Sequence, residues 1–267
     1  MGTRTSSRPR RAPLTAAPHA GDGWLHVLWD WTKSLGSALL LFLVLRTFVV
    51  QAYTIPSRSM EPTLLVGDFL MANNFLYGPH IPFTDWRLPG LRDPRVGDVV
   101  VFRPTYNTPR MDVVKRVIGV PGDTIQMHNR VVYRNGRPLR EPYVDTIYAP
   151  DEPIPYNGMG VPLPPEVDPT RYGYFWHLRY LAPGIDPRTY HPTRDNWGPL
   201  VVPSGHYLLL GDNRDESLDS RYMGFIPRDQ IRAKAMFLYY SYDPTAARPF
   251  PRLLTAMRWW RIGHVIR

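Results

Sequence analysis

The sequence predicts a mainly β protein: an antiparallel β-sheet domain with an inserted irregular β subdomain, preceded by one N-terminal transmembrane helix. The 267 residues include 30 prolines, 20 glycines and 16 tyrosines, a composition that favours strands and turns over long helices. Short apolar runs alternate with Gly-Asp, Pro-Gly and Asn-Gly turn signals along much of the chain. One long apolar stretch lies near the N-terminus and indicates the single helix.

Residues 1–33 are predicted to form a cytoplasmic tail that ends at a membrane interface. Residues 1–22 are rich in Arg, Ser, Thr, Pro and Ala, so we expect disorder there. Arginines precede the apolar stretch, which puts the N-terminus in the cytoplasm and everything after Tyr53 outside. Aromatic residues of the kind that concentrate at a bilayer surface follow the tail, namely Trp24, Trp29 and Trp31.

A membrane-spanning signal-anchor helix is predicted over residues 34–52. The uninterrupted apolar part, Leu35 to Leu45, is shorter than the roughly 20 residues that a spanning helix needs. Continuing to Ala52 supplies the length, with the side chain of Arg46 extending toward an interface. The alternatives are a buried helix of a soluble domain and a cleavable signal peptide, although no convincing small-x-small cleavage site follows.

After the apolar stretch the chain reads as β structure. We assign residues 53–123 and 200–255 to one β domain. Residues 138–203 contain fourteen prolines and little periodicity, so 124–199 is predicted to be an inserted proline-rich subdomain. Residues 256–267 combine basic and aromatic side chains, which suits either a lipid surface or a packed terminal segment. Strands are expected at 64–71 (a strand, a turn and a second strand), 96–102, 111–120, 131–138 (a hairpin around Asn135-Gly136), 206–210 and 231–240.

Composition excludes several kinds of site. The chain has no cysteine, so disulfides and cysteine-based zinc sites are absent. Its eight histidines are scattered with no pair at ligand spacing, and we expect neither a metal nor a cofactor. The formal net charge of +9 could suit nucleic acid, but much of the excess lies at the two ends of the chain. Because a membrane surface explains that distribution equally well, we expect lipid and not nucleic acid as a partner.

Two serines on a stiff segment are candidates for a nucleophile. Pro56 and Pro62 bracket Ser57 and Ser59, and the residue before each proline is pushed out of the helical region. A hydroxyl on such a backbone can be held in one direction, which a nucleophile requires. By itself the pattern is also typical of an ordinary turn.

Lys115 is a candidate base. In a strand, Val113, Lys115 and Val117 share one face. A lysine among valines is desolvated, which lowers the pKa of its ammonium and lets the neutral amine take a proton from a serine. The alternative is an edge-strand lysine that prevents aggregation.

The polar run from Gly211 to Tyr222 follows an apolar strand. Either it is a solvated turn or its side chains form a network that supports an active site. It also has acidic spacing like that of a calcium loop, but it lacks the glutamate expected at position twelve. A triad built from His206, Asp212 and some serine is possible on paper, and nothing in the local sequence favours it.

Four blocks occur in order behind the predicted anchor: Pro-Ser-x-Ser-Met-x-Pro-Thr-Leu at 56–64, Gly-Asp-Val-Val at 97–100, Lys-Arg-Val-Ile-Gly-Val-Pro-Gly-Asp at 115–123, and Gly-Asp-Asn-Arg-Asp-x-Ser-x-Asp-Ser-Arg at 211–221. Over roughly residues 35–267 the chain resembles the bacterial type I signal peptidases. These are membrane-anchored serine proteases that remove signal peptides from exported proteins. The resemblance implies a mainly antiparallel β fold whose catalytic domain is interrupted by a more variable second domain.

The resemblance also implies residue roles. Ser59 would be the nucleophile and Lys115 the general base, with the Ser57 hydroxyl and the Ser59 backbone N–H forming the oxyanion hole. Ser217 would orient the lysine amine. Supporting ion pairs would come from Asp212, Arg116, Asp219 and Arg221. Shallow pockets for small side chains at positions −1 and −3 of the cleavage site would be lined by Ile55, Pro56, Met60, Leu64, Val113 and Val114.

Two residues depart from the common pattern of this family, Arg58 where glycine is frequent and Glu216 where asparagine is frequent. Neither belongs to the expected Ser/Lys dyad. We therefore expect a single-pass enzyme of the bacterial cytoplasmic membrane, with its catalytic domain on the outer face, that cleaves exported preproteins at Ala-x-Ala sites. The oligomeric state is not indicated, and a monomer is the expectation. The alternatives are a membrane-anchored β module that binds peptides without chemistry and an autoproteolytic Ser/Lys regulator.

Overall fold

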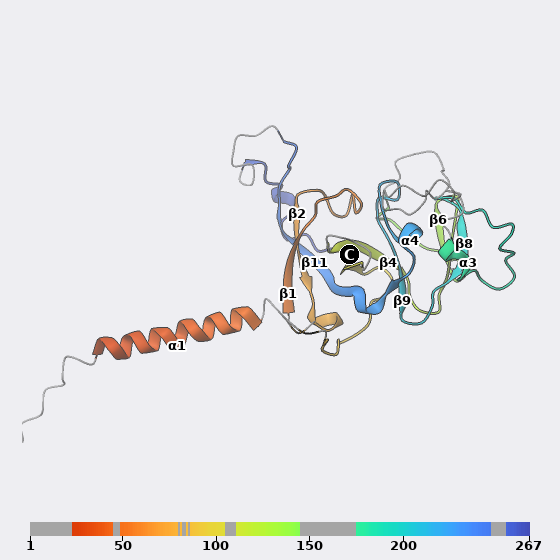
Figure 1. The fold of residues 1–267 in the computed structure, drawn as a ribbon. Coiled ribbons are helices and arrows are strands. Elements are labelled where there is room, and N and C mark those ends of the chain that lie inside the picture. The colour runs from red at the N-terminus through yellow and green to blue at the C-terminus, as the bar shows by residue number, and fades with distance from the viewer. Residues whose placement is uncertain are drawn as a thin grey trace, which may run out of the picture. The chain divides into compact units, whose positions relative to one another are not determined.

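The computed structural model describes residues 23–44, 49–79, 81, 84, 86–104, 111–144, 175–246 and 255–267. Residues 1–44 and 45–267 form two separate units. The first contains helix α1 (Gly23–Val44), and the second contains all of the β structure (Figure 1). Among the described residues, no helix combines the length and apolar character needed to cross a membrane.

The observed helix differs from the predicted one at both ends. It includes residues 23–33, which the sequence assigned to the tail and interface, and an Asp30–Lys33 ion pair of 3.5 Å one turn apart supports this part. At the other end, Val50–Ala52 belongs to strand β1 (Val50–Thr54) and not to a helix. β-branched residues here pair with β2 (Asp68–Asn73), so the sheet satisfies their backbone groups. The predicted disorder of residues 1–22 falls outside the described residues.

A seven-stranded sheet forms the larger part of the β unit, in the order β1-β2-β11-β3-β4-β9-β10. Every neighbouring pair is antiparallel, which confirms the predicted mainly antiparallel β class. The remaining strands are β3 (Val99–Phe102), β4 (Val113–Gly119), β9 (His206–Leu210), β10 (Ile226–Pro227) and β11 (Ile231–Ser241). Short helical turns occur between strands along the chain: η2 (Phe75–Tyr77) follows β2, α4 (Ser220–Met223) follows β9 and η3 (Arg228–Gln230) follows β10.

A second, four-stranded antiparallel sheet has the order β7-β6-β5-β8. Its hairpin turns at Asn135 and Gly136, both with positive φ, as the Asn-Gly signal predicts. Its strands are β5 (Thr124–His128), β6 (Val131–Arg134), β7 (Arg137–Pro138) and β8 (Trp197–Val201), with the short helix α3 (Phe175–Leu178) nearby in sequence.

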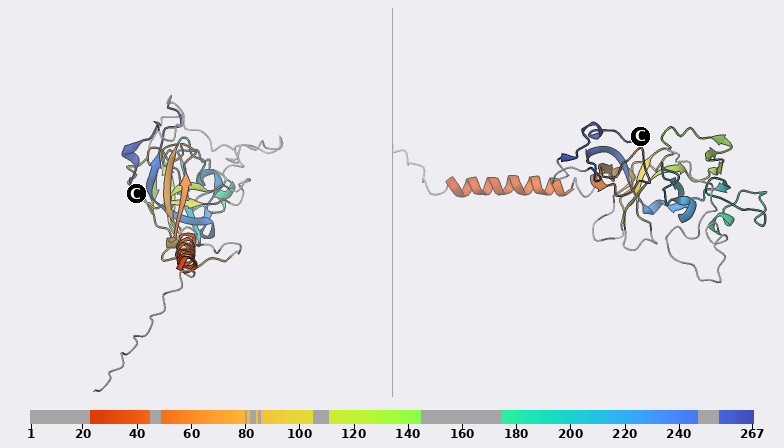
Figure 2. Two further views of the ribbon diagram at one scale, coloured as in Figure 1. Left: turned by 90° about the vertical axis from the view of Figure 1, so that its left-hand side faces the viewer. Right: turned by 90° about the horizontal axis from the view of Figure 1, so that it is seen from above.

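The C-terminal segment packs against the main sheet. It contains η4 (Trp259–Arg261), and its backbone bonds to β11, with Ile266 N–H donating to the Met236 carbonyl at 2.8 Å. Figure 2 shows this segment beside β11. Ile266 is buried in the core, whereas Trp259 and Trp260 are 70% and 78% exposed. The segment is therefore packed, and it presents two tryptophans to its surroundings.

Candidate active site

Ser59 lies on the connection between β1 and β2. The backbone pairing of the two strands continues to Ile55, whose N–H donates to the Asp68 carbonyl at 2.9 Å. Beyond it the chain turns, and buried side chains of Met60 and Leu64 anchor the turn in the core. Apolar anchors on both sides of a proline-bracketed segment explain why Ser59 is held in place although it is in no regular element.

The amine of Lys115 meets this serine. Lys115 is on β4, and its Nζ donates to Ser59 Oγ at 2.5 Å. Only 2% of Lys115 is exposed. Burial lowers the pKa of Lys115 to about 8; the carboxylates of Asp219 and Asp212 act against this shift, and the charge of Arg221 adds to it. An amine that loses its proton near pH 8 and lies in hydrogen-bond contact with a hydroxyl is the arrangement that proton abstraction from serine requires.

Arg116, the next residue on β4, points to the opposite face and binds Asp212. Its Nε and Nη2 donate to the two carboxylate oxygens at 2.8 and 2.7 Å, and both side chains are buried. Thr63 donates its hydroxyl to the same carboxylate at 2.5 Å. This network joins β4, the turn after Ser59 and the loop of residues 211–219, which we call the 211–219 loop.

A second buried ion pair, between Arg221 and Asp219, holds the C-terminal end of the 211–219 loop. Arg221 donates through Nε and Nη2 to the two oxygens of Asp219, each at 2.9 Å, and the Gly211 N–H donates to Asp219 at 3.0 Å. Burial acts to raise the pKa of Asp219, but the charge and hydrogen bonds of Arg221 outweigh it and the pKa is lowered. Asp219 therefore stays ionised close to Lys115.

The polar run is thus a buried network and not a solvated turn. Its carboxylates at Asp212, Asp215 and Asp219 are paired with arginines, so they are not arranged as a calcium loop. His206 is bonded to the Ser204 carbonyl at 2.9 Å on the exposed end of β9. The structure therefore does not join His206 and Asp212 in a triad.

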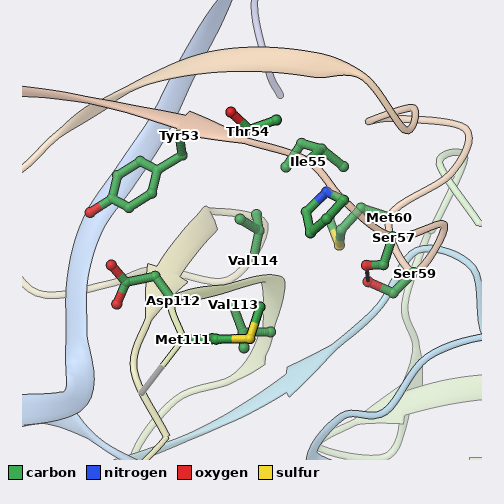
Figure 3. A pocket seen from close by; sticks show the side chains of 11 residues that line it. Tyr53, Thr54, Ile55, Ser57, Ser59, Met60, Met111, Asp112, Val113 and Val114 are labelled. Carbon is green, nitrogen blue, oxygen red and sulfur yellow. Dashed lines mark hydrogen bonds between the residues drawn. The ribbon is translucent and has the colours of Figure 1, made fainter. Parts of the chain in front are cut away.

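The two remaining predicted serines lie close to the dyad without bonding to the lysine. Ser57 Oγ is 3.4 Å from Ser59 Oγ (Figure 3). The Ser217 hydroxyl is buried against Gly211, and it makes no hydrogen bond to Lys115. The expected contact between Ser217 and the Lys115 amine is therefore not present, and the amine bonds to Ser59.

A pocket opens beside the serines. Figure 3 shows it between the end of β1 and the chain that enters β4, with Ser57 and Ser59 at one end and Tyr53 and Asp112 at the other. Its lining residues are Tyr53, Thr54, Ile55, Pro56, Ser57, Ser59, Met60, Met111, Asp112, Val113 and Val114.

Five of the six predicted pocket residues line this pocket, and Leu64 does not. Leu64 is fully buried in the core behind Met60, because its backbone N–H bonds to the Met60 carbonyl and turns its side chain inward. The prediction missed four lining residues, Tyr53, Thr54, Met111 and Asp112. All four lie within two positions of a predicted pocket residue, two before Ile55 and two before Val113, so a wider sequence window around each would have included them.

The two residues that depart from the family pattern meet at the rim of the site. Arg58 Nη1 lies 3.3 Å from Glu216 Oε1, and Arg58 also pairs with Glu61 at 3.0 Å. Both departures are therefore accommodated in one surface contact between the serine turn and the 211–219 loop.

Comparison with known proteins identifies the family of this chain. The family model described as signal peptidase, peptidase S26, matches residues 28–240. Signal peptidase I from Pseudomonas aeruginosa is 34% identical over 248 residues, covering 89% of this chain and 79% of the relative. Signal peptidase I from Rickettsia akari is 32% identical, covering 85% of this chain and 80% of the relative. A solved signal peptidase I from Enterococcus faecalis aligns with a TM-score of 0.33 and 26% identity, over 54% of this chain and 98% of that one.

The family model covers most of the chain and includes all four sequence blocks. The chain belongs to the signal peptidase family, peptidase S26, and is a hydrolase of that family.

Proposed function

We propose that this protein removes signal peptides from exported preproteins by a Ser/Lys mechanism, with Ser59 as nucleophile and Lys115 as general base. The observation that carries the proposal is the 2.5 Å contact between the Ser59 hydroxyl and a buried amine whose pKa is lowered to about 8. Membership of the signal peptidase family supplies the class of substrate.

In this mechanism the neutral Lys115 amine takes the proton from Ser59 Oγ as that oxygen attacks the scissile carbonyl carbon. The tetrahedral oxyanion is stabilised by the Ser59 backbone N–H and the Ser57 hydroxyl. The Lys115 ammonium then returns its proton to the leaving amine, and the C–N bond breaks to give an acyl-enzyme. The neutral Lys115 amine next takes a proton from a water molecule, whose oxygen attacks the ester carbonyl carbon. The Lys115 ammonium then returns this proton to Ser59 Oγ as the ester C–O bond breaks and the carboxylic acid product leaves.

The surrounding charges have a supporting role. Asp212 with Arg116 and Asp219 with Arg221 hold the 211–219 loop against Ser59, where the Asn213 N–H donates to the Ser59 carbonyl at 3.2 Å. Ser217 fills the space beside Gly211 and supports this backbone.

The pocket supports a preference for small residues before the cleaved bond. Its floor and walls near Ser59 are apolar, formed by Ile55, Pro56, Met60, Val113 and Val114. An extended substrate lying between β1 and the start of β4 would direct alternate side chains into this pocket. That geometry suits the −1 and −3 positions of an Ala-x-Ala site.

We further propose that α1 anchors the enzyme to the bacterial cytoplasmic membrane, with the N-terminus inside and the β unit outside. The apolar side chains of α1 from Leu35 to Leu43 are largely exposed in its own unit, which favours contact with lipid. The exposed Trp259 and Trp260 are suited to the same interface. Within the β unit, residues 53–123 with 200–255 form the catalytic domain, 124–199 the inserted subdomain and 256–267 the terminal segment, and the enzyme acts as a monomer.

The test is cleavage of a preprotein with an Ala-x-Ala site by the full chain in detergent. Wild type is expected to cut at that site, whereas folded Ser59→Ala and Lys115→Ala variants leave the preprotein intact. Ser204→Ala, which changes an exposed serine of a turn, is the matched control and keeps full activity. Cleavage by Ser59→Ala at the wild-type rate would overturn the dyad, and binding of the preprotein without cleavage by wild type would favour a binding module instead.

A further inference from the structure

The guanidinium group of Arg116 is tied down along its whole edge. Besides the bonds to Asp212, Nη1 donates to the carbonyls of Gly97 and Arg267 at 3.0 and 2.8 Å, and Nη2 donates to Thr63 Oγ1 at 3.3 Å. These contacts use all five N–H donors of an arginine, and all lie in the plane of the group. These hydrogen bonds fix the orientation of the guanidinium plane. They do not cover the two faces of that plane.

The ring of Tyr143 covers one of these faces. The central carbon of the Arg116 guanidinium lies 3.7 Å from the centroid of the tyrosine ring. Stacking of arginine on an aromatic ring combines cation–π attraction with exclusion of water. Tyr143 lies a few residues after β7, so it comes from the chain that leaves the second sheet and not from the sheet that carries Arg116.

Glu141, two residues earlier, binds Arg214, an arginine of the 211–219 loop. Its carboxylate accepts from Arg214 Nη2 at 2.6 Å and Nη1 at 3.2 Å, and it also accepts from the Tyr143 hydroxyl at 3.1 Å. Arg214 in turn donates through Nε to the Gly211 carbonyl at 3.0 Å. One short segment therefore contacts both Arg116 and Arg214 from the same side.

We propose that Glu141 and Tyr143 are positioning residues of the active site, which hold the 211–219 loop against Ser59 and Lys115 by way of Arg214 and Arg116. The inference rests on the proposed Ser/Lys function. It assigns a role in that function to the segment that follows β7 of the second sheet. Neither residue touches the dyad, so neither takes part in bond making.

The loop that they hold governs the surroundings of both members of the dyad. The carboxylates of Asp212 and Asp219 and the guanidinium of Arg221 are the charged groups that act on Lys115. The Asn213 N–H binds the Ser59 carbonyl. If the ring of Tyr143 is removed, the Arg116–Asp212 pair can reorient and the 211–219 loop can move away from Ser59, so that water can enter beside Lys115. Lys115 then becomes better hydrated, and its pKa rises toward the ordinary value of lysine.

The experiment compares Tyr143→Leu, Tyr143→Phe and Glu141→Ala in the full chain, with cleavage of the Ala-x-Ala preprotein measured from acid to alkaline pH. Tyr143→Leu is expected to lower kcat about 10- to 100-fold with KM nearly unchanged, since displaced catalytic groups slow the chemical step. The rising limb of its pH profile is expected to move to higher pH. Tyr143→Phe keeps the stacked ring and is expected to remain within about threefold of wild type, because it loses one hydrogen bond of modest net strength.

A matched control separates positioning from general destabilisation. Tyr180 also packs with residues of the second sheet, against Trp176 and Phe225, and it is not among the described residues that bond to or stack on Arg116. Tyr180→Leu is expected to lower the melting temperature without moving the pH profile. Equal kcat losses and unmoved pH limbs for Tyr143→Leu and Tyr180→Leu would overturn the inference. If Tyr143→Leu does not fold, Glu141→Ala is the decisive variant. An unchanged kcat of Glu141→Ala would then overturn the inference.

The outcome is distinct from that of the proposed function. Full activity of Tyr143→Leu beside an inactive Ser59→Ala would reject the positioning role and leave the dyad intact. Full activity of Ser59→Ala would reject the dyad itself.

Discussion

The Lys115 amine lies 2.5 Å from the Ser59 hydroxyl oxygen, although 56 positions separate the two residues in the chain. The contact depends on two strands that are not neighbours in the sheet: Ser59 follows β1, whereas Lys115 is on β4, and β2, β11 and β3 lie between them in strand order. The polar network around Asp212 and Asp219 then closes over the pair from the 211–219 loop. The site is therefore assembled from three segments that are distant in sequence.

The pH dependence of cleavage reports directly on Lys115. Because burial lowers the pKa of Lys115 to about 8, the fraction of neutral amine grows as the pH rises through that value. We expect kcat/KM to increase along a limb centred near pH 8 and to level off above it. Initial rates from pH 6 to 10 on the Ala-x-Ala preprotein measure this, and a flat profile would show that another group takes the proton.

The same burial predicts that Lys115 destabilises the folded protein. Between the folded pKa of about 8 and the ordinary value of 10.5 the unfolded chain binds more protons, so the free energy of unfolding rises with pH across that window. Below pH 8 the cost is fully present. Lys115→Met removes it and is expected to raise the free energy of unfolding at pH 7 by about 1–3 kcal/mol while abolishing activity. Denaturant titrations at pH 7 and 10 measure this, and a less stable variant at pH 7 would contradict it.

Ser57→Ala tests the oxyanion hole. Ser57 Oγ lies 3.4 Å from Ser59 Oγ, which is close enough for its hydroxyl to reach an oxyanion formed by attack of Ser59. Removing one such donor typically lowers kcat by about 10²- to 10³-fold. Because Ser57 is exposed and water can replace its hydroxyl in part, we expect a loss near the lower figure, with KM little changed. Activity equal to that of Ser204→Ala would exclude the role.

Gly211→Ala tests the close approach of the 211–219 loop to the nucleophile. A Cβ at Gly211 would overlap the Ser217 side chain and lie 2.5 Å from the Ser59 carbonyl oxygen. The Ser59 backbone must then shift, and a displacement of about 1 Å can cost about 100-fold in rate. Gly36→Ala in α1 is the matched control, since nothing lies near its added Cβ. A Gly211→Ala enzyme with wild-type kcat would show that the loop does not set the position of Ser59.

Local sequence signals predicted several elements well. The strand at 206–210 is found with the predicted bounds, and β4 and β11 differ from theirs by no more than two residues at either end. These segments are apolar runs that end in turn residues, so propensity and burial favour the same structure. The first half of the predicted element at 64–71 is wrong, because Leu64 belongs to a turn in which its N–H bonds to Met60 and its side chain fills the core.

Strand β1 was missed because its sequence continues an apolar stretch that also suits a helix. Val50 to Ala52 become a strand only because β2 offers a partner, and a partner strand is not visible in a local window. Tyr53 and Thr54, two of the pocket residues that the prediction did not include, belong to this strand.

The sequence alone determined the antiparallel β class, the order of the four blocks and the identities of Ser59 and Lys115 as candidates, because these depend on residue type and spacing. Only the tertiary structure decided that Lys115 is desolvated against Ser59, that Leu64 lies in the core and that Glu141 and Tyr143 cover the arginines of the site. Burial and contact between distant segments set the protonation of a lysine and the orientation of a guanidinium, and these arise only when the strands pair.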